Sequence, residues 1–136
     1  KAYAIDLGNR GAKVVVNDLG GAVDGSGSGS TPADEVVNEI ISNGGEAVAN
    51  YDSVATKEGG ESIVQSAIDN FGTVDAVINN AGILRDKSFA KLSEEELSLV
   101  IDVHLKGAFF VSQPAFKVMK EKNGWRTMVL LEFNLI

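Results

Sequence analysis

Three short groups of polar or small residues follow apolar segments of the chain and have the chemistry to hold a nucleotide. Asp18 follows the run AKVVVN, and its carboxylate could accept hydrogen bonds from both hydroxyls of an adenosine ribose while repelling a 2′-phosphate. Such an acid favours NAD over NADP. An equally acceptable explanation is that Asp18 caps the turn into Leu19 and the two glycines that follow it.

The second group is Asp52, Ser53 and Val54, which follows the segment EAVANY. A short carboxylate and a hydroxyl at that place could reach the edge and the amino group of an adenine ring. Asp and Ser also open turns and cap helices, and on spacing alone this second explanation is the more common one.

The third group is Asn80, Ala81 and Gly82, which follows the segment VDAVIN. Small residues there let the backbone approach a ribose closely. An asparagine side chain can also tie neighbouring strand ends together, because it carries both donors and an acceptor.

The elements that must position these groups follow from the spacing of apolar residues and from the Gly, Pro and Ser residues between them. Helices are expected at 2–11, 32–43, 57–72 and 93–122, and a Gly/Ser-rich loop at 20–31. Strands are expected at 12–18, 46–52 and 127–133, and a further strand within 74–82 that runs into a Gly-containing turn. This alternation predicts an α/β fold with parallel strands joined by right-handed crossovers. Ligands of such sheets bind at the carboxyl ends of the strands, and all three groups lie where an expected strand ends.

The expected helices carry apolar stripes and end signals. Ser93 and Glu96 have the spacing of a capping box, and Pro114 should bend the last helix. The inner faces of two further helices are expected to comprise Ala33, Val36, Val37, Ile40 and Ile41, and Ile63, Val64, Ala67, Ile68 and Phe71.

The composition is that of one small globular domain, with 136 residues, 44% hydrophobic and 23% charged. A net charge of −7 with no basic block argues against nucleic acid or an anionic membrane as partner. The chain has no cysteine, which excludes disulfides and thiolate metal sites. No apolar stretch approaches the length of a membrane span.

Several longer strings occur together in this chain, namely VVVNDLGG, GGEAVANYDSV and NNAGILRDKSF. They resemble the short-chain dehydrogenase/reductase family, which carries NNAG after its fourth strand, and within it the peroxisomal (3R)-hydroxyacyl-CoA dehydrogenases. The resemblance covers residues 1–122, whereas 123–136 diverge from it. We therefore expect a single partial Rossmann-like domain, a doubly wound parallel sheet with helices on both faces, over residues 1–136.

The resemblance gives the three groups a common role in holding NAD. It places Asp18 at the adenosine ribose, Asp52, Ser53 and Val54 at adenine, and Asn80, Ala81 and Gly82 along the cofactor. The implied reaction is the oxidation of a 3-hydroxyacyl-CoA by NAD in peroxisomal fatty-acid β-oxidation. The helix around 97–120 is implied to form a homodimer contact, and ordinary core packing is the rival explanation of its apolar residues.

The sequence departs from the family pattern at the groups that perform the chemistry. The family's glycine turn TGxxxGxG, which lets the backbone approach a pyrophosphate, does not occur. The family also pairs an acid/base Tyr with a Lys four residues later, but Leu7 follows Tyr3 at that spacing and Ala55 follows Tyr51. We therefore expect no catalytic residue in this chain and only background turnover.

The family's sheet has strand order 3-2-1-4-5, and its first strand has no counterpart in this chain, which begins at Lys1. Without that strand, two unpaired edges would lie about 10 Å apart. We expect either that the chain is part of a longer polypeptide or that another segment, for which TMVLLEF is a candidate, pairs with an edge. The alternative to an enzyme fragment is an inactive binding or dimerisation partner.

His104 is the one histidine and stands where many family members have an asparagine. It could act as a proton relay or a ligand, but no carboxylate or second histidine lies at helical spacing. A core or helix-kink histidine with its hydrogen bonds satisfied is the more common explanation. We expect no metal site. The resemblance implies a peroxisomal location, although the last residues Asn134, Leu135 and Ile136 are no peroxisomal address and composition alone indicates the cytoplasm.

Overall fold

The computed structural model describes residues 1–20, 32–85, 87–122 and 129–131. Helices and strands alternate along the chain as expected. The strands are β1 (Lys13–Asn17), β2 (Glu46–Asn50), β3 (Val77–Asn79) and β4 (Val129–Leu131). The helices are α1 (Ala2–Asn9), α2 (Pro32–Ser42), α3 (Lys57–Phe71), α4 (Glu94–Ile101) and α5 (Gly107–Glu121), with a 3₁₀ turn at Phe89–Lys91 and a π-helical turn at Asp102–Lys106.

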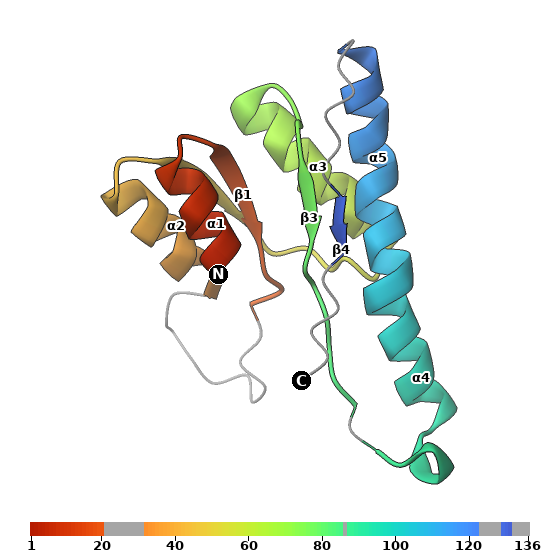
Figure 1. The fold of residues 1–136 in the computed structure, drawn as a ribbon. Helices are drawn as coiled ribbons and strands as arrows, with labels where there is room; N and C mark the ends of the chain where they lie inside the picture. Colours follow the sequence, from red (N-terminus) through yellow and green to blue (C-terminus); the bar gives the residue numbers. More distant parts are fainter. Residues whose placement is uncertain (21–31, 86, 123–128, 132–136) are drawn as a thin grey trace.

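The strands form two parallel pairs. β1 pairs with β2 from Lys13 opposite Glu46 to Asn17 opposite Asn50. β3 pairs with β4, so part of TMVLLEF does pair with a strand edge of this chain, as expected. The arrows of β1, β3 and β4 point the same way in Figure 1, which brings their carboxyl ends to one side of the fold. Among the described residues, β1 and β3 are not hydrogen-bonded to each other.

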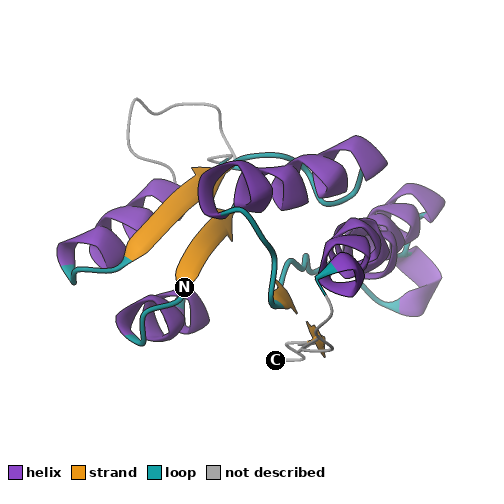
Figure 2. Ribbon diagram, turned by 90° about the horizontal axis from the view of Figure 1, so that it is seen from above, coloured by secondary structure: helices purple, strands orange, loops and turns teal. Residues whose placement is uncertain are grey.

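Helices cover both faces of the strand layer, as Figure 2 shows. α1 and α2 lie on one face and contact β1 and β2, while α3, α4 and α5 lie on the other. This is the α/β arrangement with helices on both faces that the alternating pattern predicts. None of the helices in the described part of the chain is long and apolar enough to cross a membrane.

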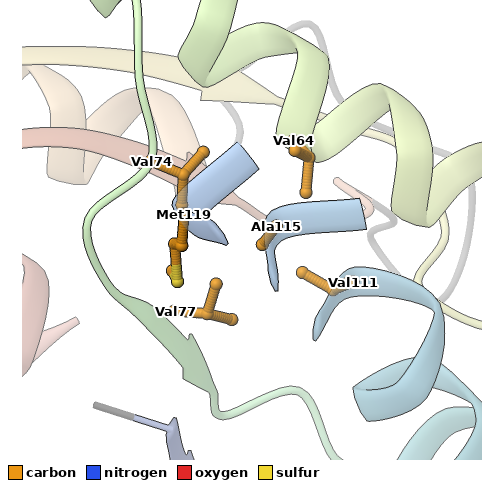
Figure 3. Close-up of a cluster of buried hydrophobic side chains, with 6 residues drawn as sticks. All are labelled: Val64, Val74, Val77, Val111, Ala115 and Met119. Carbon is orange, nitrogen blue, oxygen red and sulfur yellow. The ribbon is translucent and has the colours of Figure 1, made fainter. Parts of the chain in front are cut away.

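Each face has its own apolar cluster. The first, under α1 and α2, comprises the buried residues Val36, Ile40 and Ala47. The second lies between α3, α5 and the β3 segment (Figure 3) and comprises Val64, Val74, Val77, Val111, Ala115 and Met119. Core packing therefore accounts for Val111 and Met119, two apolar residues of the helix around 97–120 for which a homodimer contact is implied.

Local hydrogen bonds explain where two of the helices begin and end. The Thr56 hydroxyl accepts a hydrogen bond from the Gly59 N–H at the start of α3, and Gly72 ends that helix with a φ of 77°, in the region that favours glycine. The expected capping box of Ser93 and Glu96 is present at the start of α4. α5 continues through Pro114, and the change from α-helical bonding lies earlier, at 102–106.

Two expectations about the elements were wrong in detail. Ile41 was expected on the inner face of α2 but is 52% exposed. The buried face of α2 comprises Ala33, Val36 and Ile40, and Ile41, the next residue after Ile40, turns away from the strands. The strand expected from Val74 begins only at Val77 and ends at Asn79, before the expected turn. The Gly/Ser-rich loop and most of the divergent segment 123–136 lie outside the described residues.

Gly60 tests the contact between α3 and α5. A Cβ at this position would lie 2.5 Å from the carbonyl oxygen of Phe110, and a backbone atom cannot move aside cheaply. We expect Gly60→Ala to lower the free energy of unfolding by about 1–3 kcal/mol, despite the higher helix propensity of alanine. Urea unfolding measures the change. The exposed Gln65→Ala on the same helix is the control and should stay within about 0.5 kcal/mol of the parent; equal stabilities of the two variants would contradict this packing.

Candidate functional site

The candidate site lies at the carboxyl ends of β1, β2 and β3. Asp18 and Asn80 follow directly on the last residues of β1 and β3, and Asp52 follows two residues after β2. All three side chains are exposed. Because the strands are parallel within each pair and point the same way in Figure 1, the three groups face the same side of the fold.

Asp18 caps the turn that follows β1. Its Oδ1 accepts a hydrogen bond of 3.0 Å from the N–H of Gly20, which has a φ of 70°. This is the turn-capping role that the sequence allowed. The structure gives Oδ2 no hydrogen bond within the described ranges, so the same carboxylate retains an acceptor for a hydroxyl donor.

Asp52 is held by two side chains. Its Oδ2 accepts hydrogen bonds from the Ser62 hydroxyl at 2.6 Å and from the Asn50 Nδ2 at 3.0 Å. The hydrogen bond from Ser62, followed by that from Asn50, lowers the pKa of Asp52 below its ordinary value. The carboxylate is therefore ionised and acts as an acceptor over the physiological pH range.

Ser53 and Val54 have contacts within the fold. The Ser53 hydroxyl accepts a hydrogen bond of 3.2 Å from the N–H of Ala55, which is a turn-opening role. Val54 packs against the second apolar cluster, and its side chain is so close to Gly107 that a Cβ there would lie 2.9 Å from it. These contacts fix the backbone that follows Asp52.

The turn after β3 is fastened to the helix that follows it. Asn79 donates a hydrogen bond of 2.9 Å from Nδ2 to the Ser112 hydroxyl on α5. Asn80, Ala81 and Gly82 are exposed, and a Cβ on Gly82 would lie 2.8 Å from Cε1 of His104. Only glycine allows the imidazole to approach the turn so closely.

His104 is the second attachment of this turn. Its Nε2 lies 3.0 Å from the amide nitrogen of Ile83 and 2.9 Å from the carbonyl oxygen of the same residue. Depending on its tautomer, the ring accepts from the N–H or donates to the carbonyl. His104 belongs to the π-helical turn. These contacts support the interpretation of His104 as a helix-kink histidine with satisfied hydrogen bonds.

Sequence reasoning missed Asn17 and Asn50. The two side chains meet at the end of the β1–β2 ladder, where Nδ2 of Asn17 donates to Oδ1 of Asn50 at 2.8 Å. Asn50 is 7% exposed, the only polar residue among the buried ones described. The available signal was a polar residue at the end of an otherwise apolar strand.

The arrangement suits binding more than proton transfer. Tyr51, which directly follows β2, donates its hydroxyl hydrogen bond to Oδ1 of Asp34 in the first turn of α2. Across the described residues, no group of three His, Cys, Asp or Glu side chains could hold a metal ion. The strand ends instead present carboxylates and an open turn, which match hydroxyl and amino donors of a nucleoside.

Comparisons with known proteins agree with this geometry. A family model described as short chain dehydrogenase matches residues 1–127. The chain is 57% identical over 129 residues to "Peroxisomal multifunctional enzyme A" of Dictyostelium discoideum and 51% identical over 129 residues to "Peroxisomal multifunctional enzyme type 2" of Mus musculus. A crystal structure of a short chain dehydrogenase from Mycobacterium avium matches with a TM-score of 0.80 and 43% identity.

The matches cover almost all of this chain but a minor part of its relatives. The two enzymes are matched over 95% of this chain, which corresponds to 29% and 17% of their own lengths. The Mycobacterium avium structure is matched over 90% of this chain and 43% of its own. The chain therefore spans less than half the length of each of these proteins.

The hydrogen bond between His104 and the backbone of Ile83 can be tested directly. We expect His104→Ala to raise the hydrogen-exchange rate of the Ile83 amide about tenfold or more, because the imidazole is the partner of that backbone group. Exchange followed by NMR measures it. Gln113→Ala, an exposed position on α5, is the control and should leave the rate unchanged. An Ile83 amide that exchanges equally fast in the parent and in His104→Ala would contradict the hydrogen bond from the Ile83 N–H to His104.

Proposed function

We propose that this chain, which belongs to the short-chain dehydrogenase family, forms the adenosine-binding part of an NAD site in an oxidoreductase. The observation that carries the proposal is the alignment of Asp18, Asp52 and the turn at Asn80 at one end of parallel strands. Ligands of α/β sheets bind at that end. The family uses NAD or NADP, and the choice of NAD rests on the acid at the end of β1.

The residues at the strand ends fit the adenosine half of the cofactor. Asp18 has an oxygen to accept from a ribose hydroxyl, and a 2′-phosphate would meet its negative charge. Asp52, with the backbone of Ser53 and Val54, is assigned to the adenine ring. Asn80, Ala81 and Gly82 are assigned to the cofactor beyond the ribose. When bound, NAD supplies the acceptor for a hydride.

The chain's own residues bind and orient in this proposal and do not move the proton. Neither Tyr3 nor Tyr51 has a lysine four residues later, so the pair that the family uses as acid and base is not formed within this sequence. We propose that the 136 residues form one partial domain, with 1–122 following the family. We expect it to bind NAD without turning over substrate.

The substrate class is proposed from the relatives. Two of them are named as peroxisomal multifunctional enzymes, and both match 95% of this chain at more than half identity. Together with the strings NYDSV and NNAGILRD, this supports the oxidation of a 3-hydroxyacyl-CoA in fatty-acid β-oxidation as the reaction to which this site contributes. The same relatives support a peroxisomal location.

Asp18 provides the test of the cofactor assignment. We expect the purified chain to bind NAD more than about tenfold more tightly than NADP, and Asp18→Ala to reduce that ratio severalfold, because the repulsion of the 2′-phosphate is removed. Isothermal titration calorimetry with both dinucleotides measures the ratio. Asp6→Ala removes the same charge from an exposed position on α1 and is the control.

The titrations with NAD and NADP can also contradict the proposed ribose role of Asp18. If the folded parent chain binds neither dinucleotide, or if Asp18→Ala leaves the ratio unchanged, the ribose role of Asp18 is wrong. A second arm adds a (3R)-hydroxyacyl-CoA and follows NADH absorbance, for which we expect the background rate.

We further propose that α4 and α5 form a contact between two copies of the chain. Apolar side chains are exposed along these helices and the π-helical turn between them, with Leu105 66%, Phe109 56% and Leu97 49% accessible. Exposed apolar residues in a continuous series are typical of interaction surfaces. The buried residues of α5 already account for the core, so these side chains are available to a partner.

Phe109→Glu tests the dimer. A charge at the centre of an apolar contact should weaken association about tenfold or more. We expect sedimentation velocity to give a dimer mass for the parent and a monomer mass for the variant at the same concentration. Gln65→Glu adds an equal charge at an exposed position on α3, outside the proposed contact, and should retain the dimer. A parent chain that remains monomeric at tens of micromolar would contradict the contact.

A further inference from the structure

Asn50 is an amide whose hydrogen bonds are all made. Its Oδ1 accepts from Nδ2 of Asn17 at 2.8 Å and from the N–H of Asp52 at 3.0 Å. Its Nδ2 donates to Oδ2 of Asp52 and to the hydroxyl of Ser66, each at 3.0 Å. An amide has two acceptor sites and two donor hydrogens, so the side chain is saturated.

The orientation of this amide is therefore determined. If its oxygen and nitrogen exchanged places, the NH₂ group would face two donors, from Asn17 and the Asp52 backbone, and the oxygen would face the Asp52 carboxylate. The contacts with Asn17 and with the backbone and carboxylate of Asp52 would all become unfavourable, and the residue is 7% exposed, so water could not replace the lost partners.

The fixed amide in turn fixes the Asp52 carboxylate. Oδ2 is held from one direction by Asn50 and from another by the Ser62 hydroxyl on α3. Oδ1 has no hydrogen bond among the described residues, and the side chain is exposed. Asp52 thus presents one anchored oxygen to the fold and one oxygen to a ligand.

We propose that Asn50 is a positioning residue which, together with Ser62, aims Oδ1 of Asp52 at an exocyclic amino group and so makes the site select adenine over bases that carry an oxo group there. This inference rests on the proposed function, since it assumes that a dinucleotide binds at these strand ends. An ionised carboxylate can only accept hydrogen bonds. An amino group satisfies it, whereas a carbonyl oxygen in the same place would face it with like polarity.

Asn17 connects Asp52 to Asp18, the residue proposed to bind the ribose. Its Nδ2 also donates to the backbone carbonyl of Asp52 at 2.9 Å, and the N–H of Asp18 donates to the carbonyl of Asn50 at 3.1 Å. The chain segments that carry Asp18 and Asp52 are therefore joined by hydrogen bonds directly behind the two carboxylates. The ribose acceptor and the base acceptor are held at one relative position before a ligand arrives.

The experiment compares NAD with nicotinamide hypoxanthine dinucleotide, in which an oxo group replaces the amino group of adenine. We expect the full chain to bind NAD at least about tenfold more tightly than this analogue, since an acceptor would replace the matching donor. Ser62→Ala should reduce that ratio severalfold, and Ser62→Thr, which keeps the hydroxyl, should restore it. Isothermal titration calorimetry measures each dissociation constant.

A second variant acts on Asn50 itself. Asn50→Asp keeps the shape but removes both donors and places a carboxylate against Asp52, so the ratio should decrease further while the preference for NAD over NADP remains. Ser42→Ala, whose hydroxyl bonds only to a carbonyl of its own helix, and the exposed Asn38→Asp are the matched controls and should retain the parent ratio. Circular dichroism establishes that each variant is folded.

A spectroscopic readout separates positioning from a general loss of structure. The hydrogen bond from Ser62 lowers the pKa of Asp52, so Ser62→Ala should move that pKa upward towards the ordinary value, and Ser62→Thr should return it. NMR titration of the Asp52 carboxyl carbon follows it. Ser42→Ala should leave it unchanged.

The outcomes distinguish this inference from the proposed function. If the folded parent chain binds no dinucleotide, the proposed function fails and this inference fails with it. If NAD binds but the hypoxanthine analogue binds equally well, only the base selection is overturned. If the parent selects adenine and Ser62→Ala and folded Asn50→Asp both retain the full ratio, the positioning role of Asn50 and Ser62 is overturned.

Discussion

The register between β1 and β2 is the constraint on which the positions of Asp18 and Asp52 depend. The last pair of this ladder sets Asn17 opposite Asn50, and their amides bond directly. A shift of one residue would send every side chain of the strand to the opposite face, so the amides could not meet. The apolar cluster under α2 also favours this register, because the strand side chains that pack in it, such as Val14, Val16 and Ala47, must point to the same face of the sheet. The two carboxylates after these strands owe their common location to this pairing.

The third strand end is positioned by a different kind of force. β1 and β3 share no ladder hydrogen bonds among the described residues, so helix packing connects the two strand pairs. α3 contacts β1 and β2 on one side and α5 on the other, and α5 in turn contacts β3. At Gly60 the two helices are so close that a methyl group would collide with backbone. Packing fixes distance well but direction less strictly than hydrogen bonds do. The hydrogen bonds between Asn79 and Ser112 and between Ile83 and His104 orient the end of β3 and the turn that follows it.

The elements and the candidate groups could be predicted from the sequence because their signals are local. Gly72 ends α3, and the Ser93–Glu96 pair begins α4. Both do so through hydrogen bonds to residues within one helical turn. The network behind the carboxylates could not be predicted, since Asn50 bonds to Asn17 across 33 positions. In the string EAVAN an asparagine at the strand end looks like a turn residue, and only the fold makes it a buried one. The same applies to the π-helical turn, whose histidine has its partner 21 positions earlier in the chain.

If a dinucleotide binds at this edge, as we propose, the chemistry of the two carboxylates also determines its direction along the edge. Asp18 and Asp52 offer acceptors and negative charge, which suit the hydroxyl and amino donors of adenosine and oppose phosphate oxygens. The chain as a whole carries a charge of −7, so a phosphate placed beside either carboxylate would gain little from the surrounding field. The turn at Asn80, Ala81 and Gly82 is exposed and lies against an imidazole instead of a carboxylate. Adenosine is therefore expected over the first strand pair, with the pyrophosphate directed away from both acids, and this polarity follows from which ligand groups donate and which only accept.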